Sequence, residues 1–335
     1  YFQINQAQIS DFNNIDFTKA DNIAKLNEGE SLKNLPLLSY KLTSKLETDV
    51  EKFRAIYSWV STNIKGDSDM HNKVTRKRKK LKKDSISLKT WNETYKKRVF
   101  KTLVNKKRTM CTGYAYLIKE MSSISGIECR IIDGYGRTVT SNIDTLDMPN
   151  HSWNAVKINK KWYLCDATWS SGYMNERGLF IKDYNDGYFL THPNLFNKNH
   201  FPLNKKWLLS STQSKSFFTK APLVYGEIFK HKLLPIQPKE MKIKSNKNKT
   251  INFVYELLNE DFSKNISLVY FLGGNEKKLK IYNLEKKGKV LKFKHNPIWK
   301  NNYDAHLKTG NDIVATYIIK TRKSIQNTYL LTQNT

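Results

Sequence analysis

Residues 150–172, NHSWNAVKINKKWYLCDATWSSG, restrict the fold more tightly than any other stretch of the sequence. Two runs rich in aromatic and β-branched residues flank Asn159 and Lys160. A two-residue turn at that point predicts an antiparallel hairpin in which Ile158 pairs with Lys161. The turn therefore determines which residues face each other across the ribbon.

This register places a histidine and an aspartate on one face of the hairpin. Trp153 would lie opposite Asp166, and His151 opposite Thr168, while Cys165 points to the other face. His151 and Asp166 are then diagonal neighbours, about 7–8 Å apart at the backbone and within side-chain reach. A carboxylate in that position can orient an imidazole, fix its tautomer and stabilise its protonated form.

Cys111 is expected in the first turn of a helix. Thr109 can cap the start of this helix, and Ser125-Gly126 ends it. Its apolar face consists of Tyr114, Leu117, Ile118 and Met121. The helix dipole and the basic residues 106–108 would lower the pKa of a thiol there, and Gly113 would leave room for a substrate backbone. A cysteine at a helix start is usually a small buried apolar residue, so Cys111 becomes a candidate nucleophile only together with the hairpin.

In their order along the chain, the segments TMCTGYAYL, NHSWNAV and WYLCDATW resemble the transglutaminase-like superfamily. The segment FRAIYSWVSTNI resembles the helix that precedes the nucleophile in bacterial members, and DGYFLTHPNLFNKNHFPLNKKWLL is similar to the kyphoscoliosis-peptidase-like branch. The resemblance covers about residues 40–210 and implies a circularly permuted papain-like fold. It also implies that Cys111 is the nucleophile, His151 the general base and acid, and Asp166 the orienting carboxylate.

Other site residues follow less directly from the resemblance. The family often stabilises the oxyanion with a tryptophan or a backbone N–H upstream of the nucleophile. Trp91 is a candidate by its order in the chain, although a tryptophan there is more often a core residue. Trp153, beside His151, is a second substrate-binding candidate. His192 and His200 lie in the Pro-containing segments THPN and NHFP, where surface or turn roles are expected.

The fold class expected from these patterns is α+β, in three parts. Residues 1–40 form an N-terminal extension that packs on the core. Residues 41–212 form the transglutaminase-like catalytic domain of helices and an antiparallel sheet, and residues 213–335 form an all-β, immunoglobulin-like sandwich. The boundary is expected within residues 208–222, and the tail predicts six or seven strands. Residues 47–64 predict an amphipathic helix that begins with a Thr48–Glu51 capping box.

The formal net charge of +28 favours anionic partners. Only nine of the 58 basic residues are arginine, and Arg-rich patches interleaved with aromatic residues are missing, so specific nucleic-acid binding is not expected. Lys-rich patches could hold the protein to an anionic surface or polymer. The run KVTRKRKKLKK, residues 73–83, is interpreted as an exposed loop in preference to a binding site for an acidic partner. No apolar run is long enough for a membrane span.

No metal or cofactor is expected, because the histidines and cysteines lack the close pairs of zinc sites. Acidic pairs such as Asp67 and Asp69 are too scattered to predict a calcium requirement. Cys129 and Cys165 could form a disulfide or remain two buried thiols. The polar start YFQINQAQIS is similar to that of a mature chain after signal removal, so export to the periplasm, the cell surface or the medium is expected.

The function expected from these residues is cysteine-dependent acyl transfer through a thioester at Cys111, with a protein or peptide as substrate. Hydrolysis of an amide or peptide bond is the favoured reaction. Two alternatives stay open: transfer of a glutamine acyl group to an amine, and a binding or scaffold protein that keeps the fold without catalysis.

Overall fold

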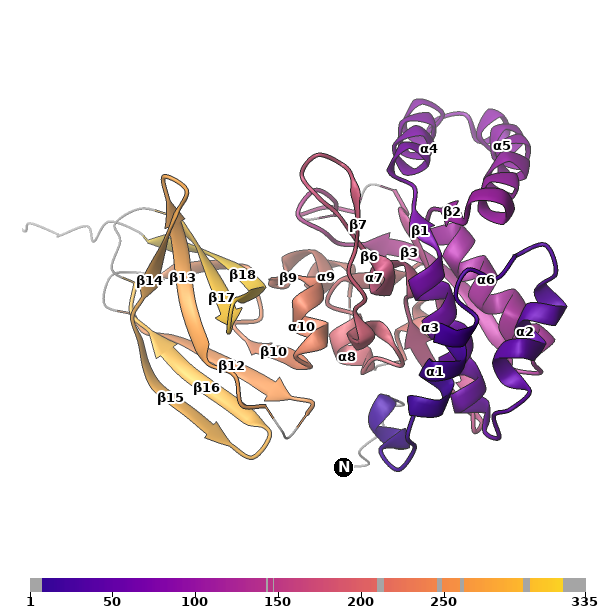
Figure 1. Cartoon of the computed structure of the whole chain (residues 1–335). Coiled ribbons are helices and arrows are strands. Elements are labelled where there is room, and N and C mark those ends of the chain that lie inside the picture. Colours follow the sequence, from indigo (N-terminus) through magenta and orange to yellow (C-terminus); the bar gives the residue numbers. More distant parts are fainter. Residues whose placement is uncertain are drawn as a thin grey trace, which may run out of the picture. The chain divides into compact units, whose positions relative to one another are not determined.

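The computed structural model describes residues 8–142, 144–146, 148–209, 214–245, 249–259, 262–297 and 302–321. These residues form two compact units (Figure 1). The first consists of the described residues up to 219 together with 226–232, and the second of 220–225 and the described residues from 233 onward. The boundary expected at 212–213 falls on residues outside the described ranges. None of the described helices combines the length and apolarity needed to cross a membrane.

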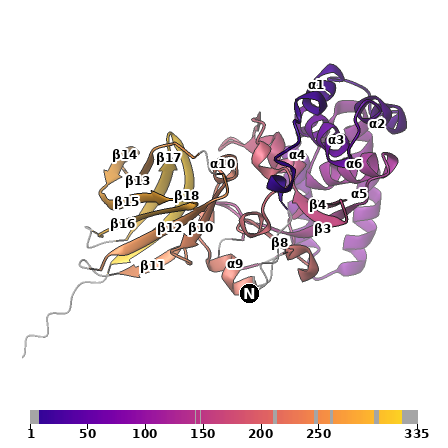
Figure 2. The same cartoon turned by 90° about the horizontal axis from the view of Figure 1, so that it is seen from below.

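In the described part of the chain, the α-helices and three short 3-10 helices belong to the first unit, apart from Lys220 at the end of α9. The helices are α1 (Thr18–Leu26), α2 (Leu35–Thr43), α3 (Asp49–Asn63), α4 (Ser68–Lys80), α5 (Ser85–Lys106), α6 (Cys111–Ile124), α7 (Ala167–Ser171), α8 (Pro193–Phe196), α9 (Lys215–Lys220) and α10 (Gly226–Lys230). The 3-10 helices are η1 (Ile9–Phe12), η2 (Asp186–Tyr188) and η3 (Lys205–Leu208). Helices α1, α2, α3 and α6 lie together in two views of the structure (Figures 1 and 2).

An antiparallel sheet of four strands lies against α6. Its order is β5 (Lys161–Cys165), β4 (His151–Ile158), β3 (Cys129–Gly136) and β8 (His200–Pro202). Two small two-stranded sheets accompany it: β1 (Lys65–Gly66) with β2 (Arg108–Thr109), and β6 (Gly172–Met174) with β7 (Phe180–Lys182). The mixture of helices and antiparallel strands confirms the predicted α+β class.

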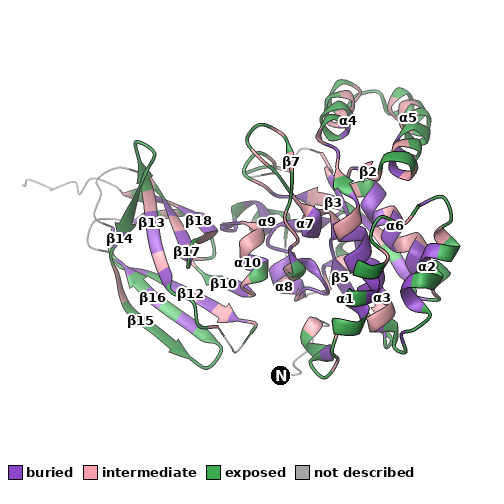
Figure 3. Cartoon of the chain, viewed as in Figure 1, coloured by how far each residue is buried: buried purple, intermediate pink, exposed green. Residues whose placement is uncertain are grey.

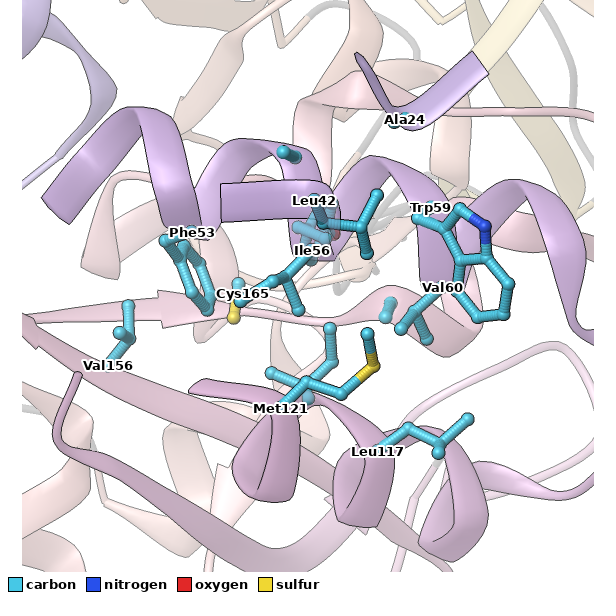
Figure 4. Close-up of a cluster of buried hydrophobic side chains, with 14 of the residues drawn as sticks. Ala24, Leu42, Phe53, Ile56, Trp59, Val60, Leu117, Met121, Val156 and Cys165 are labelled. Carbon is cyan, nitrogen blue, oxygen red and sulfur yellow. The ribbon is translucent and has the colours of Figure 1, made fainter. Parts of the chain in front are cut away.

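The core of this unit lies between α3, α6 and the sheet. Figure 4 shows Phe53 and Ile56 of α3 on one side of this core, Met121 of α6 on another, and Cys165 of β5 beside them. Residues of the N-terminal segment, such as Phe12, join the same cluster. This apolar contact holds the start of α6 and the end of β5 in fixed positions, and both carry predicted site residues.

Helix α3 confirms the prediction for residues 47–64. Thr48 is its N-cap: the Thr48 hydroxyl accepts the Glu51 backbone N–H, and the Glu51 carboxylate accepts the Thr48 backbone N–H at 3.0 Å. This reciprocal pair satisfies two backbone donors that a helix start otherwise leaves free.

The basic run 73–83 is not a loop, so that expectation is wrong. Most of it belongs to α4, which pairs with α5 in a helical hairpin whose surface is largely exposed (Figure 3). Met70 and Val74 are the buried residues of α4. With only two buried apolar positions, α4 has almost no hydrophobic periodicity in its sequence, which explains why the pattern did not predict a helix.

The second unit is all-β, as predicted. One sheet has the order β10 (Leu233–Gln237), β12 (Ile251–Leu257), β16 (Val290–His295) and β15 (Ile281–Lys287). The other has the order β11 (Lys242–Ser245), β18 (Asp312–Thr321), β17 (Tyr303–Thr309), β13 (Ile266–Leu272) and β14 (Asn275–Leu279), and β9 (Leu223–Val224) also pairs with β18. The sheets are joined through a 2.6 Å hydrogen bond between the hydroxyls of Tyr255 and Tyr317.

The described part of this unit has more strands than the six or seven predicted. The count rested on the runs INFVYELL, ISLVYFLGG, KKLKIYNLEKKGKVLKFKH and DIVATYIIKT, which do not include β9, β10, β11 or β17. Strands β9 and β11 are short, with two and four residues, and β10 contains Pro235, whereas β17 keeps an alternating pattern. Short length and a proline weaken the signal of a strand, so they explain β9, β10 and β11 but not β17.

Candidate active site

Cys111 is the first residue of α6 and is partly exposed. Strands β1 and β2 are paired, α4 begins two residues after β1, and α6 begins two residues after β2. The strand pairing therefore determines where the start of α6, and with it Cys111, lies. The N-cap is Met110, and no side chain caps the helix. The prediction that Thr109 caps this helix is therefore wrong: Thr109 belongs to β2 and is completely buried.

The hairpin has the predicted register. Ile158 pairs with Lys161, and Asn159 and Lys160 have φ angles of 50° and 66°, as a tight two-residue hairpin turn requires. His151, at the start of β4, lies with its Nε2 2.7 Å from Oδ2 of Asp166. The diagonal contact expected from the sequence is thus present.

The second strand of the hairpin is shorter than predicted. It ends at Cys165, and Asp166 becomes the N-cap of α7. Oδ1 of Asp166 accepts the backbone N–H groups of Thr168 at 2.8 Å and Trp169 at 3.2 Å. Thr168 therefore lies in a helix and not opposite His151, which corrects that part of the expectation. The cap holds the carboxylate rigidly, with Oδ2 directed at the imidazole.

The thiol and the imidazole of this group perturb each other. Burial alone would raise the pKa of Cys111, but the hydrogen bond to His151, the charge of His151 and the Ser152 backbone N–H together lower it. Burial alone would lower the pKa of His151, but the charge of Asp166 and its hydrogen bonds to Asp166 and Cys111 raise it to about 10. The lowered pKa of Cys111 and the raised pKa of His151 both favour a thiolate beside an imidazolium at neutral pH.

Asp166 is completely buried and remains ionised. Burial opposes its charge, but His151 and the hydrogen bonds from His151 and His200 hold its pKa well below the usual range. A buried carboxylate with hydrogen bonds to both oxygens is stable only while those partners are in place. The site therefore depends on all the donors around Asp166.

His200 is the site residue that the sequence did not predict. A surface or turn role was expected, but His200 is completely buried in β8, and its Nε2 lies 3.1 Å from Oδ2 of Asp166. Its ring also stacks on Phe196 with centroids 3.8 Å apart. Pairing of β8 with β3 brings His200 to the site across 34 residues of sequence. A local pattern carries no signal for such a contact.

His200 differs from His151 in its charge. Burial lowers the pKa of His200 to about 4, against the opposing effect of Asp166. The lowered pKa favours a neutral His200 ring at neutral pH, whereas the raised pKa of His151 favours an imidazolium. Nδ1 lies 2.7 Å from Oδ1 of Asn199 and 3.2 Å from the backbone carbonyl oxygen of Phe196, both of which are hydrogen-bond acceptors.

The structure does not bring the weaker candidates to the thiol in the roles expected of them. Trp91 lies on α5, stacks on Tyr95 with centroids 4.8 Å apart, and is not among the residues that line the cleft beside Cys111. Trp153 is 1% exposed and packs under His151 and His200. A Cβ atom at Gly113 would lie 2.0 Å from Oγ1 of Thr109, so this glycine accommodates a neighbouring side chain, not a substrate.

A cleft of about 220 Å³ opens beside Cys111 and His151. One wall is a single face of α4, formed by His71, Val74, Thr75, Arg78 and Lys79. The segment between β3 and β4 contributes Asn142, Met148 and Asn150, among others. None of the described lining residues is acidic. Cys111 is therefore accessible from a cleft whose described charged groups are basic.

Three ligand-type atoms, from His151, Asp166 and His200, lie within 4.8 Å of one another and could hold a metal ion. In the structure the same atoms are hydrogen-bonded at 2.7 and 3.1 Å, and both oxygens of Asp166 already have donors. A metal ion would have to replace these bonds. The donor set therefore fits a hydrogen-bonded group better than a metal site.

The other two cysteines are free thiols in the structure. Cys129 and Cys165 are buried, and both approach Asn154. Burial raises the pKa of Cys129 to about 12 and also raises that of Cys165. Of the three thiols, Cys111 alone combines partial exposure with a lowered pKa.

Residues 37–167 match the family model of the transglutaminase-like superfamily. The chain contains a transglutaminase-like domain. This match includes Cys111, His151 and Asp166, and it ends one residue after the aspartate. The predicted family resemblance is thereby confirmed.

Curated relatives align with a larger part of the chain. The kyphoscoliosis peptidases of Mus musculus and Homo sapiens are 29% and 30% identical over 214 residues, which are 61% of this chain and 29% of each relative. Hillarin of Drosophila melanogaster is 24% identical over 234 residues, which are 65% of this chain and 26% of hillarin. The chain thus spans less than a third of the length of these relatives.

Proposed function

We propose that the transglutaminase-like domain is a cysteine-dependent acyl-transfer enzyme that hydrolyses amide bonds in proteins or peptides. The observation that carries the proposal is the linked group Cys111–His151–Asp166 at the edge of a cleft. The kyphoscoliosis peptidases named above support the choice of hydrolysis, since their name describes peptidases.

The proposed reaction begins with attack of the Cys111 thiolate on an amide carbonyl carbon. The imidazolium of His151 donates its proton to the leaving nitrogen as the carbon–nitrogen bond breaks, which leaves a thioester and a free amine. His151 then takes a proton from water, and the resulting hydroxide attacks the thioester and releases an acid and the thiol. Asp166 keeps Nε2 protonated throughout, so that Nδ1 can exchange protons with the thiol and the leaving group.

The backbone at the start of α6 supplies candidate donors for the oxyanion. The first N–H groups of a helix have no intrahelical partner and point out of its N-terminus. Those of Cys111 and Thr112 therefore take over the role considered above for Trp91. The helix dipole adds to their effect on a developing negative charge.

The decisive experiment is site-specific alkylation followed by a substrate test. At about pH 6, iodoacetamide should modify Cys111 much faster than an ordinary thiol, whose pKa is about 8.5. Peptide mass spectrometry would locate the label, and the buried Cys129 and Cys165 are internal controls. Alkylation of Cys111 at the rate of a free thiol would contradict the proposal.

The substrate test uses Cys111→Ala. This variant should lose all amide cleavage while its thermal stability stays nearly unchanged, because Cys111 is only partly buried. The wild-type protein should be incubated with a casein digest with and without a primary amine. New amino termini indicate hydrolysis, whereas incorporation of the amine would instead support the transglutaminase alternative.

A further inference from the structure

The arginine and lysine on the cleft wall have no function in the acyl-transfer reaction itself. Arg78 and Lys79 line the cleft beside Cys111. Neither forms an ion pair with an acidic side chain in the described part of the chain. Other basic residues nearby are engaged: Arg108 binds Asp67 at 3.4 Å, and Lys73 lies over the ring of Tyr95.

The cleft-lining residues of α4 recur with helical spacing. His71, Val74, Thr75, Arg78 and Lys79 follow the pattern i, i+3, i+4, i+7 and i+8, which defines one continuous face. Val74 is buried, and the charged groups lie toward the far end of the helix. The wall is therefore apolar in its middle and strongly basic at one end.

The basic end lies at a defined distance from the nucleophile. Pairing of β1 with β2 places the start of α4 next to the start of α6, so the His71 end of α4 is the end near Cys111. The charge of His151 contributes to the lowered pKa of His71, which agrees with this orientation. Seven residues of helix separate His71 from Arg78, about 10 Å along the axis. An extended peptide covers that distance in about three residues.

We propose that this face of α4 selects acidic peptide substrates, with a carboxylate side chain about three residues from the bond that Cys111 attacks. Arg78 and Lys79 bind that carboxylate. The inference rests on the proposed acyl transfer at Cys111 and adds a substrate class to it. It also gives a local role to two of the 58 basic residues, independent of the overall charge.

A pair of affinity labels tests the proposal without a known substrate. Bromoacetyl-Gly-Gly-Glu-Glu-amide and bromoacetyl-Gly-Gly-Lys-Lys-amide carry opposite charges near the third position from the reactive carbon. The second-order rate of Cys111 alkylation should be about tenfold higher with the acidic label, as expected for two partly exposed charge pairs. The ratio of the two alkylation rates measures how strongly the cleft-lining face of α4 prefers the acidic label.

Two double variants with the same loss of charge separate local binding from the general field. Arg78→Gln with Lys79→Gln should remove most of the preference and leave only the part that the overall net charge produces. Arg76→Gln with Lys80→Gln, on α4 but outside the cleft lining, should retain most of it. Glutamine has nearly the helix propensity of lysine and arginine, so both variants should keep α4 intact. Arg78→Glu with Lys79→Glu should reverse the preference in favour of the basic label.

Iodoacetamide serves as the neutral reference and keeps the two proposals distinguishable. Its rate tests the thiolate at Cys111, whereas the label ratio can be measured even with an ordinary thiol at higher pH. Equal alkylation rates with the acidic and basic labels in the wild-type protein would overturn the assignment of the α4 face. An equal fall of the rate ratio in the two Gln double variants would overturn it as well.

Discussion

At the scale of single residues, the two histidines on Asp166 should contribute in different ways. His151 contacts both the thiol and the carboxylate, whereas His200 contacts the carboxylate and has a lowered pKa. We expect His151→Ala to raise the midpoint of the pH profile of Cys111 alkylation toward about 8.5, the value of an ordinary thiol. His200→Phe keeps the stacking on Phe196 and should leave the midpoint low.

The measurement is the rate of iodoacetamide labelling of Cys111 between pH 4 and 10 in both variants. An equal shift in the two variants would mean that the histidines act as one unit on the thiol. A shift in His200→Phe alone would exchange their assigned roles.

Asp166→Asn should slow turnover by roughly 10⁴-fold, the size of effect seen when a triad carboxylate is replaced by an amide. The amide no longer fixes the imidazole tautomer or stabilises the imidazolium. Asparagine caps helices about as well as aspartate, so α7 should remain folded. Steady-state kinetics and circular dichroism together test this prediction, and an unchanged rate would remove Asp166 from the mechanism.

The ion pair between His151 and Asp166 makes the free energy of unfolding depend on pH. His151 has a raised pKa in the folded protein, so its contribution is complete below its unfolded pKa of about 6.5 and is lost as the pH rises through about 10. The contribution of Asp166 has the opposite sign: it is present above about pH 3.9 and lost as the pH falls. Urea unfolding at pH 7 and 10 should therefore show a larger loss of stability in the wild type than in Asp166→Asn.

At the scale of elements, Gly113 determines how α6 packs on β2. A Cβ atom at this position would lie 2.0 Å from Oγ1 and 2.7 Å from Cγ2 of Thr109. Gly113→Ala should therefore destabilise the protein by about 1–3 kcal/mol, the usual cost of overpacking. Thr109→Ala removes both close atoms, so the double variant should recover part of the loss.

A double-mutant cycle on the free energy of urea unfolding measures this coupling. If Gly113→Ala leaves stability unchanged but raises KM for a peptide, the glycine serves substrate approach after all.

Sequence patterns predicted the elements whose geometry is local. The tight turn at Asn159-Lys160 determined the register of the hairpin, and the spacing of apolar residues predicted α3 and α6. The same patterns could not predict the role of His200, because its position depends on strand pairing between distant segments. They also missed α4, whose cleft-lining face is basic at one end and scarcely buried.

At the scale of the whole molecule, the net charge of +28 should attract anionic reagents to every exposed thiol. At low salt, the ratio of the iodoacetate rate to the iodoacetamide rate at Cys111 should exceed that of N-acetylcysteinamide several-fold. The excess should fall as salt is added, because the screening length shortens from about 30 Å at 0.01 M to about 3 Å at 1 M. Salt screens the charged groups within a few ångströms of Cys111 least, above all His151. Part of the excess in the iodoacetate rate should therefore persist at 1 M salt. A ratio that does not change with salt would show that the distributed lysines have no effect at the site, and that only the groups lining the cleft determine which anions reach the thiol.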